Sequence, residues 1–302
     1  MKNTTPHVIK NESHIRKEVL IKYKDCPDRE YVNSLFAKLD KSKHFNDEWS
    51  ERSNPYNNLN WRKDIIGISK TIDMLDLIDS NLKIVDAGAG TGKISLAIAE
   101  YADQKNMDVN IFAIDQSYAM LEKCPEHKKI KKYVADVEYM SFIPDDSVDR
   151  IICSMVLHSE FEQAENIIKE FRRILKKGGI LVIFESIPMD DSLIDFYMSF
   201  LTIKEKRVMF TKDDLFNMLN RNDFEDVIIE DMILEEQSIK NWLNNSCTEY
   251  NLANKIIKIH QDASDDIKRK ISMVERDNDI FCSWKFAFVK GVKKSLVGDA
   301  TI

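Results

Sequence analysis

The sequence predicts an α/β fold in which helices cover both faces of a mostly parallel sheet. Several short runs are apolar throughout, without the polar alternation of a half-exposed strand, and such runs are typical of strands buried on both faces. Amphipathic stretches, with apolar residues three or four positions apart, separate these runs, as in chains that alternate strand and helix. Moreover, Gly88, Gly90 and Gly92 stand within five positions at the end of the first run, although the whole chain has eight glycines.

Composition limits the classes of protein to consider. A chain of 302 residues, 43% of them hydrophobic and 31% charged, suits one large domain with additions. The formal net charge of -7 is opposite in sign to the charge that nucleic-acid-binding domains usually carry, so no nucleic-acid partner is expected. No apolar run approaches the roughly 18 residues of a membrane span, and the N-terminus lacks the apolar core of a secretory signal. We therefore expect a cytoplasmic protein. Its five scattered cysteines, none in a C-x-x-C pair, predict reduced thiols rather than disulfides or a zinc site.

The first stretch of the chain, from residue 1 to about 58, is polar, mixed in charge and only weakly periodic. It contains two short helix-like pieces, IRKEVLIKY and REYVNSLFAKL, which predict a helical extension rather than a second full domain. A clear helical stripe follows, and at this spacing its apolar side chains should lie against a sheet. The stripe consists of Trp61, Ile65, Ile68, Ile72 and Leu75.

Strands and helices alternate in the central part of the chain. The predicted strands are NLKIVDAG, VNIFAID (109–115), KKYVAD (131–136), VDRIICSMVL (148–157) and GILVIFES. One helix is expected to start at or near Gly92, a second covers SYAMLEKC, and a third runs from Ala164 to Leu175. The third helix is expected to end in KKG (176–178), because lysines and a glycine suit a helix C-terminus.

The late part of the chain has a well-specified helix start in FTKDDL. Thr211 is the expected cap, Asp214 completes a capping box, and Phe210 faces Leu215 as a hydrophobic staple. Two more strands, at about 226–233 and 280–290, should be neighbours in the sheet if the helical insertion between them projects outward. The expected organisation is a helical N-terminal extension that acts as a lid (1–60), a main domain (61–291) with a helical insertion (234–279), and a C-terminal tail (292–302).

The glycine loop DAGAGTG does not fit the two common phosphate-binding patterns. A dinucleotide loop has G-x-G-x-x-G, but counted from Gly88 the third glycine position holds Lys93. No G-K-[ST] closes the motif, which excludes a P-loop. The spacing is G-x-G-x-G, preceded by Asp86. We infer that the glycines admit a ligand against the backbone without binding a pyrophosphate.

Five motifs stand in order over residues 84–186: VDAGAGTG, FAIDQSYAML, VADVEYMSF, SMVLHSE and LKKGGILVIFES. In this ordered set the chain resembles the class I S-adenosylmethionine-dependent methyltransferases, and most of all the branch that methylates small molecules, including quinone-pathway enzymes. The resemblance implies a Rossmann-like, seven-stranded, mostly parallel sheet with S-adenosylmethionine as cofactor. It also implies methyl transfer to a small-molecule acceptor. The resemblance covers the central part well, the late strands loosely and the N-terminal extension hardly at all.

The resemblance assigns roles to the ends of the first three strands. Gly88 and Gly90 leave space for the methionine end of the cofactor, and Asp86 organises the loop. Asp115 accepts both ribose hydroxyls, although it could instead cap the following helix. Asp136 takes the exocyclic amine of adenine, unless it merely ends a strand. The remaining expected cofactor contacts are Ala89, Gln116, Met120, Val137, Ser154 and Arg62, of which Met120 could equally belong to the core and Arg62 to a solvated helix face.

His158 is the candidate catalytic residue. Methyl transfer requires alignment of the acceptor and exclusion of water, and a base only where the acceptor must lose a proton. Of the six histidines, only His158 follows a core strand at the sheet edge where α/β proteins bind ligands. It could also orient a loop or donate a hydrogen bond to the acceptor. No aspartate ends the fourth strand, so a metal ion is not expected.

The acceptor pocket is expected to form between the N-terminal extension and the segment after the fifth strand. The apolar stretch SLIDFYMSFL (192–201) should cover the acceptor, and the candidate pocket residues are Trp49, Tyr56, Tyr197, Met198 and Trp242. Two other functions stay open: methylation of RNA or protein, and S-adenosylmethionine binding without methyl transfer, by a sensor, a partner subunit or a non-methylating catalyst. The acceptor and the oligomeric state are not predicted.

Overall fold

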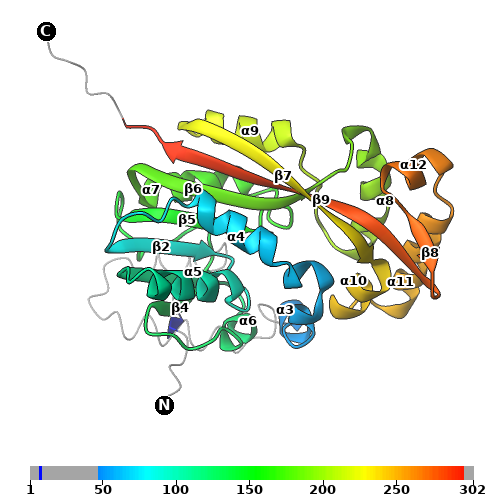
Figure 1. Cartoon of the computed structure of the whole chain (residues 1–302), viewed down its shortest axis with the longest axis horizontal. Coiled ribbons are helices and arrows are strands. Elements are labelled where there is room, and N and C mark those ends of the chain that lie inside the picture. Colours follow the sequence, from blue (N-terminus) through cyan, green and yellow to red (C-terminus); the bar gives the residue numbers. More distant parts are fainter. Residues whose placement is uncertain (1–6, 9–46, 296–302) are drawn as a thin grey trace, which may run out of the picture.

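The computed structural model describes residues 7–8 and 47–295 (Figure 1). The two helix-like pieces predicted within residues 1–46 therefore lie outside the described residues, as does most of the predicted tail. None of the helices in the described part of the chain has the length and hydropathy that crossing a bilayer requires.

A single mixed sheet forms the centre of the fold, in the order β1-β4-β3-β2-β5-β6-β9-β7, with β8 paired to β9. The strands are β1 His7–Val8, β2 Leu82–Ala87, β3 Val109–Asp115, β4 Ile130–Val134, β5 Val148–Ser154, β6 Leu175–Ile187, β7 Phe224–Ser238, β8 Val274–Arg276 and β9 Asp279–Lys293. All pairs from β1 to β6 are parallel, and β9 joins β6 and β7 antiparallel. The α/β prediction is confirmed, including the adjacency of the two late strands.

Two short strands raise the count above the predicted seven. β1 has two residues and β8 has three, so neither is long enough to show a period of two in the sequence. The seven longer strands are those that the sequence predicted.

Helices cover both faces of the sheet. They are α3 Asp47–Arg52, α4 Ile65–Met74, α5 Lys93–Gln104, α6 Tyr118–Glu122, α7 Ala164–Ile174, α8 Ile194–Lys204, α9 Lys212–Arg221, α10 Ile239–Asn245, α11 Tyr250–Gln261 and α12 Asp265–Lys270, with the 3-10 turns η1 Tyr56–Asn58, η2 Asn60–Lys63 and η3 Asp191–Leu193. One core cluster joins α7 and α9 to the sheet through Phe171 and Leu215. A second cluster joins α4 and α5 to it through Ile72 and Ile98.

The predicted helix starts are correct, but two predicted element ends are wrong. Gly92 precedes α5, and Thr211 and Asp214 form the capping box of α9. The fourth strand ends at Ser154 rather than at 157, because Met155 has φ +57° and turns the chain. The lysines and glycine at 176–178 belong to β6 rather than to a helix C-terminus, since Leu175 already pairs with Val148 in the sheet.

The stripe predicted from Trp61 to Leu75 is correct except at Ile65. Trp61, Ile68, Ile72 and Leu75 pack in the second core cluster, whereas Ile65 is 75% exposed. Asp64 caps α4 by accepting hydrogen bonds from two backbone N–H groups. The helix therefore begins after Asp64, and Trp61 lies in the separate turn η2.

At one end of the molecule β7 and β9 carry a helical cap (Figure 1). Each of these strands has 15 residues. Because β7 continues to Ser238, the first helix of the insertion begins at Ile239 rather than at the predicted residue 234. A third core cluster joins Phe200 of α8, Leu243 of α10 and Ile256 of α11 to Cys282 of β9. The segment after the fifth strand and the insertion thus pack together as one cap.

Candidate functional site

The glycine loop between β2 and α5 has a backbone that side chains would disturb. Gly88 has φ +74°, and a Cβ built there would lie 2.2 Å from Cγ2 of Val156. Gly92 has φ +73°, and its added Cβ would lie 2.0 Å from Sγ of Cys124. At Gly90, with φ +54°, the added Cβ would meet one atom of Tyr56 at 3.9 Å and no other within 4 Å among the described residues. Gly90 therefore faces open space, in which a ligand could contact the backbone.

Asp86 ties this loop to the first turn of α5. Its Oδ2 atom accepts a hydrogen bond from the Ser95 backbone N–H at 3.0 Å and another from the Ser95 hydroxyl at 2.6 Å. Burial raises the pKa of Asp86 to about 6, against the opposing effect of the two Ser95 hydrogen bonds. The carboxyl therefore orders the loop, as the sequence predicted, and it also borders the cavity described below.

Asp115 lies across from the glycine loop at the end of β3. Its Oδ2 atom accepts the Gly90 N–H and its Oδ1 atom accepts the Ser117 N–H, both at 2.8 Å. Ser117, and not Asp115, is the N-cap of α6. Each carboxylate oxygen has a second lone pair that can accept another donor. Burial raises the pKa of Asp115 to about 6.

A cavity of about 850 Å³ opens along this sheet edge, and we call it the glycine-loop cavity. All the predicted cofactor residues line it. They are Arg62, Asp86, Gly88, Ala89, Gly90, Asp115, Gln116, Met120, Asp136, Val137 and Ser154. The ends of neighbouring strands meet here because β2 pairs with β3 and β5, so residues that are far apart in the sequence line one cavity.

Arg62 enters the glycine-loop cavity from η2 and not from a solvated helix face. Its guanidinium lies over the Tyr56 ring, 4.3 Å from the centroid, and Nη2 donates to the Thr91 hydroxyl at 3.3 Å. Its Nε is buried and has no hydrogen-bond partner among the described residues. A buried donor of this kind is suited to a ligand acceptor.

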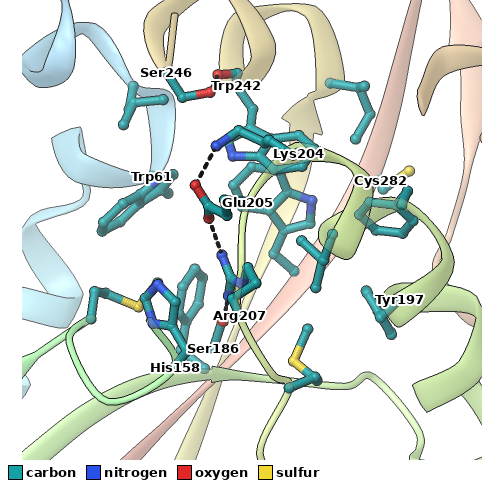
Figure 2. Close-up of a pocket in the computed structure, with 18 of the residues that line it drawn as sticks. Trp61, His158, Ser186, Tyr197, Lys204, Glu205, Arg207, Trp242, Ser246 and Cys282 are labelled. Carbon is teal, nitrogen blue, oxygen red and sulfur yellow. Dashed lines mark hydrogen bonds and ion pairs between the residues drawn. The ribbon is translucent and has the colours of Figure 1, made fainter. Parts of the chain in front are cut away.

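A second cavity of about 1020 Å³ lies under the helical cap, and we call it the aromatic cavity (Figure 2). The four tryptophans of the chain, Trp49, Trp61, Trp242 and Trp284, all line it. The two cavities share three lining residues, which are Trp49, Tyr56 and Met155. They therefore adjoin at these side chains.

The cap supplies much of the aromatic cavity. Phe196, Tyr197, Phe200 and Leu201 of α8 line it, and they belong to the stretch 192–201 that the sequence placed over an acceptor. Of the five candidate pocket residues, Met198 does not line it and the other four do.

His158 borders the aromatic cavity rather than the glycine-loop cavity. Its Nδ1 atom lies 2.8 Å from Oε2 of Glu185, whose Oε1 accepts the Leu157 N–H at 2.7 Å. The His158 carbonyl accepts the Val208 N–H at 3.0 Å, which ties the turn after β5 to the segment after α8. Glu185 was not among the predicted site residues. It lies near the carboxyl end of an apolar strand, as Asp86 and Asp115 do, and that position was the available signal.

A charged cluster in the aromatic cavity was also missed. Glu205 contacts Lys204 at 2.8 Å, Arg52 at 3.0 Å and Arg207 at 3.1 Å; Figure 2 shows the chain from Lys204 through Glu205 to Arg207. These residues lie around the end of α8, where the sequence shows only an ordinary charge run. The described residues contain no group of three or more metal-ligating side chains.

Comparison with known proteins gives a consistent picture of the central part. Residues 85–183 match the family model described as a methyltransferase domain. A carboxy-S-adenosyl-L-methionine synthase from Shewanella denitrificans is 27% identical over 172 residues, which are 53% of this chain and 67% of that protein. A 2-methyl-6-phytyl-1,4-hydroquinone methyltransferase from Spinacia oleracea is 30% identical over 122 residues, which are 39% of this chain and 33% of that protein.

The solved structures agree on the fold. The crystal structure of the YcgJ protein from Bacillus subtilis has a TM-score of 0.65 and 20% identity, and the match covers 77% of this chain and all of that one. The match to the two curated relatives is shorter, since this chain spans about two thirds of the first and a third of the second.

Proposed function

We propose that this chain, which carries a class I S-adenosylmethionine-dependent methyltransferase domain, uses S-adenosylmethionine to methylate a small-molecule acceptor. The cofactor would bind in the glycine-loop cavity and the acceptor in the aromatic cavity. The observation that carries the proposal is that the two cavities adjoin at Trp49, Tyr56 and Met155. A methyl group at this junction would face the acceptor directly.

The glycine-loop cavity fits the proposed cofactor in its donors and acceptors. Asp115 can accept the ribose hydroxyls, since each of its oxygens keeps a lone pair beside its backbone contact. Asp136 and Val137 also line the cavity, and they would contact adenine. Arg62 offers a buried N–H for the methionine carboxylate, and Gly90 leaves room beside the main chain.

The aromatic cavity fits a small acceptor. Apolar side chains of the cap, among them Phe196, Phe200 and Leu201, line it. Apolar walls exclude water and hold the acceptor in line with the methyl group, which are the main requirements of the displacement. The net charge of -7 gives no support for an RNA substrate.

His158 is the proposed base. The carboxylate of Glu185 faces Nδ1, which leaves Nε2 for the cavity that His158 lines. S-adenosylmethionine held in the glycine-loop cavity would supply the methyl group, and its bond from the methyl carbon to sulfur would break as the acceptor atom bonds to that carbon, which would release S-adenosylhomocysteine. The acceptor proton passes to Nε2 of His158 in this step.

Incubation with methyl-labelled S-adenosylmethionine and a cell lysate, separated afterwards into small-molecule, RNA and protein fractions, tests the proposal. Label in a small product, together with S-adenosylhomocysteine in equal amount, is the expected result. Label in RNA or protein would overturn the small-molecule assignment. Tight binding with no label transferred to any fraction would instead indicate a protein that binds the cofactor without methyl transfer.

The mass of the recovered cofactor adds a second readout. The Shewanella denitrificans relative is by name a carboxy-S-adenosyl-L-methionine synthase, so a heavier, carboxylated cofactor is the alternative product to seek. Its appearance in place of S-adenosylhomocysteine would exclude methyl transfer as the activity of this chain.

A further inference from the structure

We propose that the acceptor carries an anionic oxygen group, a carboxylate or a phosphate, and that Arg207 binds this group inside the aromatic cavity. This inference rests on the proposed function, because it concerns the acceptor of that same site. The inference goes beyond the proposed function by defining the chemical class of the acceptor.

The first argument is an excess of buried positive charge. Lys204 and Arg207 both pair with the single carboxylate of Glu205, and the three side chains are only 3%, 8% and 14% exposed. The neighbouring cations hold the pKa of Glu205 well below its usual range. Among the described residues that line the cavity, Glu205 is the only acid. Buried cations in excess of their partners are costly, and an anionic ligand would offset this cost.

The second argument is an unused donor on Arg207. Its Nη1 donates to Glu205 at 3.1 Å and its Nη2 to the Ser186 hydroxyl at 3.2 Å. Its Nε is buried and has no hydrogen-bond partner within the described part of the chain. Figure 2 shows the Arg207 side chain held between Glu205 and Ser186 at the edge of the cavity. The guanidinium is therefore fixed by two contacts and retains a third N–H for an oxygen of the ligand.

The rest of the cavity favours an apolar body attached to that anion. The tryptophans and the α8 side chains Phe196, Tyr197, Phe200 and Leu201 give its wall large apolar surfaces. Lys204 lies over the Trp242 ring, 5.4 Å from its centroid, and its burial lowers its pKa. The cavity thus combines one charged end with apolar walls, an arrangement that selects a small organic acid over a neutral molecule of the same shape.

The anion-binding residue and the proposed base lie close together. Glu185 holds His158 and the next residue, Ser186, holds Arg207. In addition, the Val208 N–H donates to the His158 carbonyl at 3.0 Å. An acceptor bound by Arg207 would therefore place its anionic group and its reacting atom only a short distance apart. This geometry fits a compact acid rather than a long-chain one.

Intrinsic fluorescence can test the inference directly, since all four tryptophans line the cavity. The probes are cyclohexanecarboxylate, cyclohexyl phosphate and the neutral cyclohexanecarboxamide, added to the full chain. We expect at least one anion to bind about tenfold or more tightly than the amide, as expected for a hydrogen bond to a charged group. The tighter of the two anions assigns the group as carboxylate or phosphate. Equal binding of all three probes would overturn the inference.

Matched variants assign the effect to Arg207. Arg207→Gln should remove the preference for the anion and leave amide binding unchanged, and Arg207→Lys, which keeps the charge and the fold, should reduce the preference in part. Arg269→Gln is the control, because Arg269 is 75% exposed and pairs with Asp266 on α12. Persistence of the preference in both Arg207 variants would refute the assignment.

A parallel titration with S-adenosylhomocysteine separates this inference from the proposed function. Binding of that compound without any anion preference would contradict the inference alone. An anion preference without binding of that compound would contradict the proposed function alone.

Discussion

The Nδ1 atom of His158 lies 2.8 Å from a carboxylate oxygen of Glu185, and the two side chains are only 7% and 0% exposed. The other Glu185 oxygen accepts the Leu157 N–H, which fixes the carboxylate in place. Because an ionised carboxylate only accepts hydrogen bonds, the Nδ1–H of His158 would donate to Glu185, and the neutral ring would keep the lone pair of Nε2 for the acceptor proton. Glu185 thus acts as a positioning residue for His158.

Replacement of Glu185 by glutamine should lower kcat by about a hundredfold or more, the usual contribution of a general base. The amide would present an N–H to Nδ1, and the proton would then move to Nε2. KM and the Kd for S-adenosylhomocysteine should stay within about twofold, since neither depends on the tautomer of the ring. Glu225→Gln, on the exposed part of β7, is the matched control.

The variant His158→Asn should lose a similar factor, and the double variant no more than the single ones, because the two residues act as a unit. The pH dependence of kcat in the wild type should disappear in all three variants. If the loss of kcat in the double variant equalled the product of the two single losses, or if the pH profile of kcat stayed unchanged in the variants, His158 and Glu185 would not act as a pair.

Gly90→Ala should block the cofactor without damaging the fold. Gly90 and Gly178 both have positive φ, +54° and +73°, and neither would place an added Cβ closer than 3.9 Å to another described atom. Alanine at either position should cost about 1–2 kcal/mol of stability. Only Gly90 borders the glycine-loop cavity, so only its variant should lose S-adenosylhomocysteine binding in calorimetry. Equal binding by both variants would show that the cofactor does not contact the loop there.

Asp115→Asn should weaken binding of S-adenosylhomocysteine by about tenfold to a hundredfold. The carboxylate accepts two backbone N–H groups at 2.8 Å, and the amide nitrogen of asparagine would oppose one of these donors and lose an acceptor for the ribose. A hydrogen bond to a charged group contributes about 1.5–3 kcal/mol. Asp108→Asn, at an exposed position before β3, should bind as the wild type does. If Asp115→Asn lowered the affinity for S-adenosylhomocysteine less than Asp108→Asn does, the ribose would have to bind at another residue.

The sequence was sufficient for the cofactor half of the site because that half is local. Asp86, Gly90 and Asp115 each stand where a strand ends, and the parallel order of the strands brings those ends to one edge. A single sequence therefore predicts which residues face the cavity, and the structure places all of them there. Their contacts with the cofactor stay a prediction.

The aromatic cavity could not be predicted in the same way because it depends on contacts between distant segments. Arg52 meets Glu205 across 153 positions, and His158 meets Glu185 across 27. Neither pair has a spacing that a helix or strand period would reveal. The wrong strand end at 157 has a similar cause, since the positive φ of Met155 interrupts an apolar run that continues in the sequence.

Binding of the cofactor should also depend on pH, through Asp115. Burial raises the pKa of this carboxyl to about 6 in the ligand-free protein, and only the ionised form accepts both ribose hydroxyls. As the pH falls below about 6, the free protein takes up a proton that binding must then displace, so affinity falls. A single group of this kind makes binding about tenfold weaker at pH 5 than at pH 7.

The pH range of this loss of affinity distinguishes Asp115 from a carboxyl with a depressed pKa. A carboxyl with a depressed pKa would leave affinity constant from pH 7 to pH 5, whereas the raised pKa of Asp115 predicts the loss within that range. Asp86, whose pKa burial also raises to about 6, can steepen the fall through the loop that it orders. Calorimetric titration with S-adenosylhomocysteine at pH 5, 6 and 7 checks the profile, and Asp115→Asn should flatten it. A wild-type affinity that is constant over these values, or a variant profile as steep as that of the wild type, would exclude Asp115 as the ribose acceptor.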